Sequence, residues 1–434
     1  MTLALSIDDT ASCIGPQPDI ALAMRLFDEL RVRTGGPRGI TRASYGLGEQ
    51  IAHDIVRREA RRLGLECRID AGCNLFMTLR GQRPGPAIFI GSHLDSVPMG
   101  GNYDGAAGVV AGLAVVAGYR AAGVVPPRDV TVMAIRAEES TWFSASYIGS
   151  RAAFGQLACA ELDTVLRTGD QVALGHAIDA AGGDTELLRK GIGLNPAQVA
   201  TFIEPHIEQG PVLVACDCPV GIVTGIRGSF RFRQAVCHGV YAHSGATPRE
   251  HRHDAVMAVA RLTVRLEDAW TRLAGQGHDL TVTFGQVATD LSEAAFSKVA
   301  GRVDFAIDIR SQSDETLDLM RAELRLAVTA AETSHRVRFD LGRETGSEPA
   351  LMDLKAISDL AEIAETQGIE AEVMACGAGH DAAVFAQMGV PTAMLFIRNR
   401  NGSHNPNEAM EIEDFAAAAR ILSAFCLRDT GHRP

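Results

Sequence analysis

Residues 86–105 read PAIFIGSHLDSVPMGGNYDG, and the rest of the predicted architecture is built around them. The first five residues are apolar, rich in β-forming types and bounded by glycine or proline, which is typical of a buried central strand. His93, Asp95 and Asp104 follow that strand. Ligands of open α/β sheets bind in the crevice beyond the carboxyl ends of the strands, so these side chains are well placed to hold a metal. The alternative is a surface loop whose polar side chains are solvated or cap the next helix.

The composition is that of an ordinary globular protein with more than one core. The chain has 434 residues, of which 46% are hydrophobic and 22% are charged. A chain of that length exceeds the usual size of a single core, so we expect two domains. The formal net charge of −12 argues against nucleic acid or an anionic membrane as a partner, since neither attracts an acidic surface. It is compatible with a small carboxylate-bearing substrate, which needs only a local arginine.

The N-terminus and the cysteines predict a cytoplasmic protein. The first ten residues carry two acids and no basic segment, unlike a signal peptide. No apolar run reaches the roughly 18 residues of a membrane span. The nine cysteines are scattered without a repeated CxxC spacing, which favours a reducing compartment over a disulfide framework. Cys216 and Cys218 flank one aspartate, but without a second pair of thiols we interpret them as ordinary cysteines rather than a metal clip.

Hydrophobic periodicity predicts helices and strands in turn through the first half of the chain. We expect helices at 18–33 and 46–63, and strands at 66–69, 75–79, 86–90, 129–135 and 201–204. The small residues after Asp104 predict a helix that lies close to the sheet and points its N-terminal amides at the site. Residues 156–200 predict helices and loops without a chemical signature.

Acids or histidines follow three further predicted strands. Glu138 and Glu139 come after one of these strands, His206 after the second and His404 after the third. Two adjacent carboxylates at the end of a buried strand are costly unless something pairs with them, and a dication supplies that partner. The alternative for the glutamate pair is an exposed position at the start of a helix.

A second domain is predicted from a change of composition near Val220. The elements that follow have the order β-α-β-β-α-β, at 229–236, 254–273, 280–287, 302–310, 315–333 and 337–341. That order is typical of a ferredoxin-like layer, compact enough to be a separate domain inserted in the first. A helix at 353–367, strands at 371–374 and 392–396 and a helix at 413–426 then return to the first domain. We predict a mixed-sheet α/β catalytic domain at 1–221 and 343–434, with the inserted domain at 222–342.

Five side chains form a set of candidate metal ligands. They are His93, Asp104, Glu139, His206 and His404. Five nitrogen and oxygen ligands exceed what one tetrahedral zinc needs, but they suit two metals that share a bridging carboxylate. Asp104 is the natural bridge, with His93 and His206 on one metal and Glu139 and His404 on the other. We expect two divalent ions per subunit, zinc first, with manganese, cobalt and nickel as the other suitable metals.

Two acids beside these ligands have predicted roles of their own. Asp95 lies two residues after His93 and can accept the free ring N–H of that ligand, which fixes its tautomer. If Glu139 binds metal, Glu138 is held a few ångströms away with a free carboxylate, where a general base for the attacking water belongs. The set predicts metal-assisted hydrolysis of a carbonyl or phosphoryl compound.

Seven motifs resemble the hydantoinase/carbamoylase branch of the M20 metallopeptidase family. They are residues 91–105, 137–139 (AEE), 149–152 (GSRA), 206–211 (HIEQGP), 308–310 (DIR), 377–382 (GAGHDA) and 402–406 (GSHNP). That branch contains N-carbamoyl-L-amino-acid hydrolases, β-ureidopropionases and allantoate amidohydrolases. The resemblance covers nearly the whole chain. It implies a dinuclear catalytic domain with an inserted lid that also forms a homodimer.

The resemblance also implies roles for single residues. It gives the five ligands and Glu138 the same metal and base roles. His206 is similar to this branch, since peptidases of the wider family usually have an acid there. His243 matches a lid histidine that reaches into the partner protomer's site and polarises the scissile carbonyl, the alternative being a residue at the rim of a turn. Arg310 matches an arginine that clamps the substrate carboxylate.

Further positions match the substrate side of the family's site. Gln209 and the backbone of Gly377 and Ala378 match positions that contact the ureido or carboxylate end of the substrate. His380 matches as well, without an assigned role. Ser297 lies where the family commonly has asparagine, in the turn before a glycine.

Three positions depart from the family pattern. Besides Ser297, Cys376 stands where the family has serine before GAGH, and Ser140 stands where a glycine often follows the glutamate pair. The metal set is intact and the substrate set is altered, so the chemistry is better supported than the substrate.

The sequence therefore favours an amidohydrolase that cleaves the linear C–N bond of an N-carbamoyl amino acid or a related N-acyl amino acid. An aminoacylase or dipeptidase with the same metals and a different acyl group is the alternative. A binding protein on an inactive scaffold is disfavoured, because degenerate members would be expected to lose ligands and here all five and the base are present.

Overall fold

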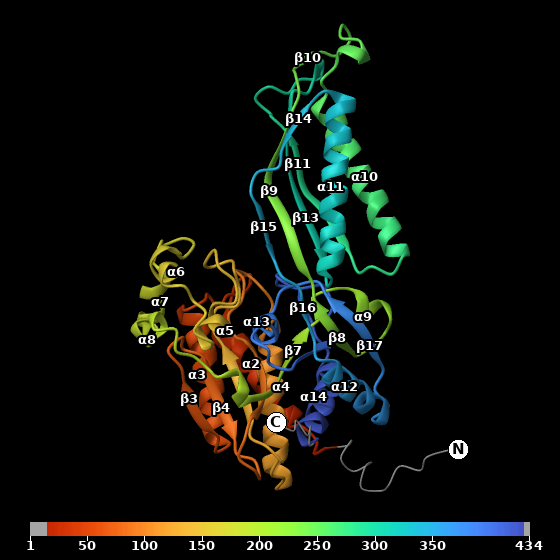
Figure 1. The fold of residues 1–434 in the computed structure, drawn as a ribbon. Helices are drawn as coiled ribbons and strands as arrows, with labels where there is room; N and C mark the ends of the chain where they lie inside the picture. The colour runs from red at the N-terminus through yellow and green to blue at the C-terminus, as the bar shows by residue number, and fades with distance from the viewer. Residues whose placement is uncertain (1–14, 429–434) are drawn as a thin grey trace, which may run out of the picture. The chain divides into compact units, whose positions relative to one another are not determined.

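The computed structural model describes residues 15–428 and divides the chain into two compact units (Figure 1). Unit 1 contains the chain up to Thr224 and again from Met352, and unit 2 comprises Gly225–Leu351. The first ten residues, from which we predicted that a signal peptide is missing, lie outside the described residues. Within the described range, no helix combines the length and the apolar character that a membrane crossing needs. All eight cysteines in this range are free thiols.

Unit 1 is built on a nine-stranded mixed sheet. The path through the sheet is β16-β8-β18-β7-β5-β6-β4-β3, and β17 also pairs with β8. The strands are β3 Glu66–Ile69, β4 Leu75–Leu79, β5 Ala87–His93, β6 Val130–Ile135, β7 Val199–Ile207, β8 Val220–Ile226, β16 Ala350–Leu351, β17 Ala371–Cys376 and β18 Thr392–Ile397. The four central strands β18, β7, β5 and β6 are parallel, and β4 and β8 run antiparallel to them. The predicted mixed α/β architecture is confirmed.

The largest core of unit 1 joins this sheet to five helices. These are α2 Ile20–Thr34, α3 Leu47–Arg62, α4 Ala106–Ala122, α12 Leu354–Thr366 and α14 Ile412–Leu427. Helix α4 is the most deeply buried of them, as its small residues predicted. A Cβ added at Gly108 would lie 2.1 Å from the carbonyl oxygen of Pro205 in β7, so only glycine permits this close approach. The start of α4 is therefore fixed against the ends of the parallel strands.

Shorter helices surround the central strands. They are α5 Ile148–Ala153, α6 Cys159–Thr164, α7 Leu174–Ala180, α8 Thr185–Arg189, α9 Val212–Ala215 and α13 Ala382–Gln387. Four of them, α5, α6, α7 and α8, share a separate small core with the segment around Phe143. This agrees with the helices and loops predicted for residues 156–200.

Strand β8 is an element that the sequence did not predict. Its residues VGIVTGI were interpreted as the lead-in to the inserted domain, because two glycines and a change of composition resemble a linker. Instead β8 pairs antiparallel with β18, with Ile222 opposite Leu395. Unit 2 begins after Thr224 and ends at Leu351, whereas the predicted insertion spans residues 222–342.

Unit 2 has an antiparallel sheet with two long helices along one face (Figure 1). Its strands are β9 Gly228–His238, β11 Thr281–Thr289, β13 Arg302–Ser311, β14 Arg338–Asp340 and β15 Glu344–Ser347, and its helices are α10 Ala255–Gly275 and α11 Asp314–His335. The strand order is β11-β13-β9-β14, and β15 continues the edge along β9. Residues of β13 alternate between buried and half-exposed, which is why one face packs on the helices. A short ribbon, β10 Ala242–His243 with β12 Lys298–Val299, completes the unit.

Candidate metal centre

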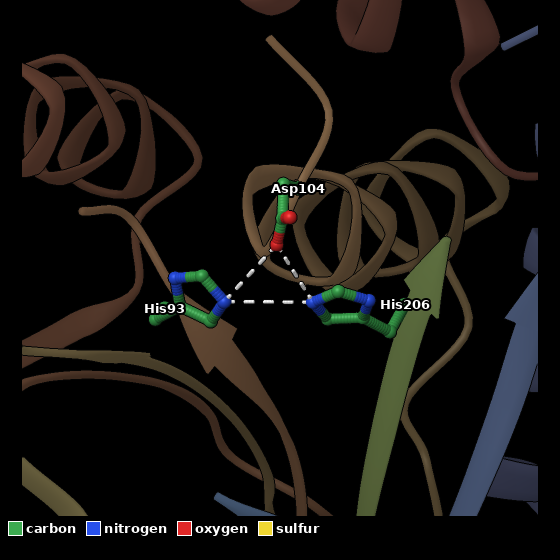
Figure 2. Close-up of side chains that lie close together, drawn as sticks. All are labelled: His93, Asp104 and His206. Atoms are coloured by element: carbon green, nitrogen blue, oxygen red, sulfur yellow. Dashed lines mark hydrogen bonds and ion pairs between the residues drawn. The ribbon is translucent and has the colours of Figure 1, made fainter. Parts of the chain in front are cut away.

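The first group of candidate ligands comprises His93, Asp104 and His206, which we call the histidine-side group (Figure 2). His93 ends β5, His206 lies near the end of the neighbouring strand β7, and Asp104 lies just before α4. Their three ligand atoms lie within 4.8 Å of one another. The Oδ1 atom of Asp104 is 3.5 Å from Nε2 of His93 and 3.2 Å from Nε2 of His206. All three side chains are buried.

Both imidazole rings of this group are held by their Nδ1 atoms. Nδ1 of His206 lies 2.8 Å from the carbonyl oxygen of Ile207. Nδ1 of His93 lies 3.1 Å from the carbonyl oxygen of Asp95 and 3.3 Å from a carboxylate oxygen of the same residue. A ring that donates from Nδ1 presents the lone pair of Nε2, which is the form that binds a metal. The two Nε2 atoms face each other across 3.4 Å.

The second group, which we call the loop-side group, comprises Asp104, Glu139 and His404. Nε2 of His404 is 3.5 Å from Oδ2 of Asp104 and 3.6 Å from Oε1 of Glu139. His404 comes from the loop between β18 and α14, has a φ of +61°, and its side chain is 53% exposed. Asp104 therefore faces both groups, with one carboxylate oxygen toward each.

Glycine at position 105 is required beside this shared carboxylate. Gly105 has a φ of +65°, and a Cβ there would lie 2.5 Å from the ring of His93. Its backbone N–H also donates to Nε2 of His206 over 3.1 Å. Any larger residue would push the ring out of the cluster, so the sequence Asp-Gly is part of the geometry of the centre.

Burial leaves the charges of the centre incompletely balanced. Burial, followed by the nearby Asp104 carboxylate, raises the pKa of Glu139 to about 8. Burial also raises the pKa of Glu138 well above its usual range, although His93 opposes the shift. Burial alone would lower the pKa of His93, but the carboxylates of Asp104 and Asp95 raise it well above its ordinary value. Divalent cations would compensate this excess of buried carboxylates, and the donor set fits them.

The carboxylate of Glu138 lies beside the ligands. Its Oε2 atom is 4.0 Å from Nε2 of His93, and the side chain is buried. The backbone N–H groups of Glu138 and Glu139 donate to the two carboxylate oxygens of Asp95, each over 3.1 Å. The hydroxyl of Ser44 also donates to Asp95 over 2.6 Å. The carboxylate of Asp95 thus lies beside His93, where the sequence predicts it, and also holds the backbone of the glutamate pair.

A buried ion pair supports the turn that carries these glutamates. Ala137 has a φ of +51°, which is unfavourable for a residue with a Cβ. Its N–H donates to Oε1 of Glu49 over 2.9 Å, and Glu49 is paired with Arg136 at the same distance. The sequence does not reveal this role of Glu49, because an acid in the first turn of an amphipathic helix is ordinary.

Two side chains, Gln209 and Ser403, contact the second oxygen of Asp104, and Glu408 supports them from behind; Ser403 and Glu408 were not predicted. The amide Nε2 of Gln209, predicted as a substrate contact, donates to Oδ2 of Asp104 over 2.8 Å. The hydroxyl of Ser403 contacts the same oxygen and lies 2.8 Å from Oε2 of Glu408. Glu408 accepts the N–H of Tyr103 over 2.7 Å. Ser403 could have been suspected from its place beside His404, whereas nothing in the sequence indicates Glu408.

His380 lies against the histidine-side group. Its ring centroid is 4.3 Å from that of His206, and its Nε2 atom has no hydrogen-bond partner among the described residues. Burial, with the nearby His206, lowers its pKa well below the ordinary value, so the ring is a neutral donor or acceptor. Gly377 and Ala378 lie in the loop between β17 and α13. There the thiol of Cys376 lies 3.1 Å from the carbonyl oxygen of Ala378, in place of the family's serine.

Three predicted residues lie in unit 2. His243 in β10 is opposite Lys298 in β12, and the carbonyl of Ser297 accepts the N–H of Ser244 over 2.8 Å. Both predicted residues are exposed and belong to one short ribbon. Arg310 near the end of β13 pairs with Asp308 over 2.7 Å. The predicted metal and base residues all lie in unit 1, as do Gln209, Gly377, Ala378 and His380.

Histidines and carboxylates gathered at the carboxyl ends of parallel strands define a class, that of α/β metal-dependent hydrolases. Within that class the chain belongs to peptidase family M20/M25/M40, whose model matches residues 89–428. It is 33% identical to an N-carbamoyl-L-amino acid amidohydrolase of Geobacillus stearothermophilus over 88% of this chain and 92% of that protein. It is 31% identical to an allantoate amidohydrolase of Escherichia coli (strain K12) over 89% and 92%.

A solved structure agrees with this assignment. The crystal structure of a hydantoinase/carbamoylase family amidase from Burkholderia ambifaria matches with a TM-score of 0.84 and 29% identity. The match covers 96% of this chain and 97% of the other. The resemblance predicted from the seven motifs is confirmed.

Proposed function

We propose that the chain is an amidohydrolase that cleaves the linear amide C–N bond of an N-carbamoyl (ureido) amino acid or a related N-acyl amino acid. Relatives with this kind of activity in their names align over most of the chain. The observation that carries the mechanism is the sharing of the Asp104 carboxylate between two groups of candidate ligands.

Two divalent ions fit these groups, and zinc is the metal that we expect. His93, Asp104 and His206 would hold one ion, and Asp104, Glu139 and His404 would hold the other. Nitrogen and carboxylate donors equally suit manganese, cobalt or nickel. When bound, such ions lower the pKa of water and act as Lewis acids toward a carbonyl oxygen.

Glu138 acts as the general base and then as the general acid. Its carboxylate accepts a proton from the attacking water and returns it to the leaving nitrogen as the C–N bond breaks. Two features support this role. The side chain lies beside His93 without belonging to either ligand group, and its backbone is fixed by Asp95.

The substrate-binding residues come from both units. Arg310 binds the substrate carboxylate as a bidentate partner, and His243 of the partner subunit polarises the scissile carbonyl. Gln209, Gly377, Ala378, Ser297 and His380 contact the rest of the substrate. The motifs that resemble the family support these assignments, and with them the proposal that unit 2 is a ferredoxin-like lid through which the protein forms a homodimer. The free thiols of the described residues support a reducing compartment, the cytoplasm.

The altered substrate positions also fit a second candidate function. Ser297 and Cys376 replace the usual residues, and an M20-type aminoacylase or dipeptidase would use the same metal and base residues on another acyl group. Enzymes of this kind are separated by their kcat/KM for competing substrates.

The test is a competition assay with one amino acid carried as its N-carbamoyl, N-acetyl and N-peptidyl derivative. The protein is loaded with zinc or manganese, and metal content is measured on the same sample. We expect the carbamoyl derivative to have the highest kcat/KM, by at least about tenfold, because a site built to hydrogen-bond the ureido nitrogen rejects analogues that lack it. A preference for the acetyl or peptidyl derivative would move the assignment to an aminoacylase or dipeptidase.

A further inference from the structure

A second set of metal-binding side chains lies outside the centre described above. Sγ of Cys216, Sγ of Cys218 and a carboxylate oxygen of Glu372 all lie within 4.8 Å of one another. Cys216 is exposed, and Cys218 and Glu372 are half-exposed. None of the three belongs to either group around Asp104. No local pattern joins the two thiols to Glu372, which lies about 150 residues further along the chain.

The fold explains why these side chains meet. Cys216 directly follows helix α9, and Cys218 stands two residues before β8, whose sheet neighbour β17 carries Glu372. Asp217, between the two cysteines, has a φ of +56°. This left-handed residue makes the tight turn, and the N–H of Cys218 donates back to the carbonyl of Leu213 over 3.0 Å.

The turn is also fixed from outside. The carboxylate of Asp217 pairs with Arg398 over 2.5 Å, and the N–H of Arg398 donates to the carbonyl of Pro219 over 3.0 Å. The strained residue is therefore held in place by its neighbours, and the two thiols keep their common position.

We infer that Cys216, Cys218 and Glu372 form a separate site for a thiophilic divalent cation such as zinc, which ties the turn after α9 to strand β17. Two thiolates and a carboxylate are suitable zinc ligands, and water would complete the tetrahedron. Sulfur atoms around one tetrahedral zinc lie roughly 3.8 Å apart, so small rotations of exposed side chains close the site. Its function is structural, because the ion would link the turn before β8 to the neighbouring strand β17 at the surface.

The local charges favour a cation. Glu372 and Glu370 place negative charge beside the Cys218 thiol. The thiols must lose their protons to become ligands. Binding therefore displaces thiol protons, and the affinity rises with pH.

Cadmium titration of the reduced, metal-free, full-length chain tests the inference. Cadmium bound to thiolate gives an ultraviolet charge-transfer band, whereas the centre around Asp104 offers only nitrogen and oxygen ligands and gives none. We expect the band to saturate at one two-thiolate site per chain. The double variant C216S/C218S should lose it, and E372Q should keep the band but bind cadmium at least about tenfold more weakly.

Cys159 provides the matched control, because it is an exposed thiol outside the set. C159S should keep the full band, and circular dichroism should give the same spectrum for all variants. A wild-type chain without the band, or a band that survives in C216S/C218S, would overturn the inference.

A second measurement needs no variant. Alkylation of the wild-type chain followed by peptide mass spectrometry should find Cys216 and Cys218 protected by zinc, while Cys159 reacts at the same rate with and without the metal. Equal rates at all three thiols would contradict the inference.

Discussion

The two ligand groups around Asp104 differ in how the fold holds their histidines. In the histidine-side group both rings come from strand ends, are buried and are fixed through Nδ1. In the loop-side group His404 comes from a loop, has a left-handed backbone and is half-exposed. We therefore expect the histidine-side ion to bind tightly and the loop-side ion to exchange more easily.

The sheet explains why the histidine-side group is rigid. Strands β5 and β7 are parallel neighbours, with Ile90 opposite Ile203. The pairing ends there, and His93 and His206 each lie three residues further along their strands, so both histidines reach the same edge of the sheet. His404, by contrast, lies eight residues beyond Phe396, which is the partner of His206 in β18. Its position depends on the loop rather than on the ladder.

The largest expected effect comes from a change that spares both ligand groups. Glu138→Gln removes the proposed base but keeps the size of the side chain. We expect kcat to fall by about 10²–10⁴-fold, because general acid–base catalysis contributes that much. Steady-state kinetics and metal analysis on the same sample check this. Retained activity would remove Glu138 from the mechanism, and lost metal would make it a ligand.

The second prediction compares the two groups directly by exchanging one histidine in each. His206→Ala should weaken the tighter of the two ions by at least about 100-fold, since it removes a fixed, buried ligand. His404→Ala should weaken the other ion by about 10–100-fold, and an excess of metal should restore part of kcat. Calorimetric titration of the metal-free variants measures both affinities.

Two outcomes of that experiment would contradict the predicted difference between the two ligand groups. One is an equal loss for both variants, and the other is a failure of excess metal to rescue His404→Ala while it rescues His206→Ala. Glu138→Gln serves as the matched control, because it should bind both ions like the wild type.

The smallest expected effect concerns pH. In the metal-free protein burial raises the pKa of Glu138, and the pKa of Glu139 is raised to about 8 by burial and by Asp104. Between its ordinary value and 8 the folded state keeps a proton that the unfolded state has released, so the free energy of unfolding falls as pH rises. The metal replaces that proton. The gain in Tm on adding zinc should be larger near pH 8.5 than near pH 6, by on the order of a few degrees.

Differential scanning calorimetry with and without metal at the two pH values measures this gain. Glu139→Gln should reduce the pH dependence of the metal-free protein, because one of the two titrating carboxyl groups is gone. A gain that is the same at both pH values would contradict the assigned burial of Glu139.

The sequence predicts the strand-end part of the site well. Apolar runs followed by His93, the Glu138-Glu139 pair and His206 favour a shared site over solvated loops, because polar groups at the ends of buried parallel strands meet at one edge. The small residues of α4 likewise predicted a helix close to the sheet. These features depend on local patterns that are visible within about ten residues.

The supporting contacts could not be predicted in the same way. Glu49, Ser44 and Glu408 touch the centre only through folding, and their local patterns are those of ordinary helix or loop residues. Strand β8 was missed because its glycines resemble a linker, and only its pairing with β18 gives it a place in the sheet. Such contacts join residues far apart in the chain, which a local pattern does not encode.

Anomalous diffraction at the metal absorption edge, on crystals of the metal-loaded protein, tests the central idea most directly. Two peaks should flank the side chain of Asp104, one beside His93 and His206 and one beside Glu139 and His404, with the first more fully occupied after limited chelation. A single peak at Asp104, or none, would contradict the shared carboxylate on which the proposed hydrolysis depends.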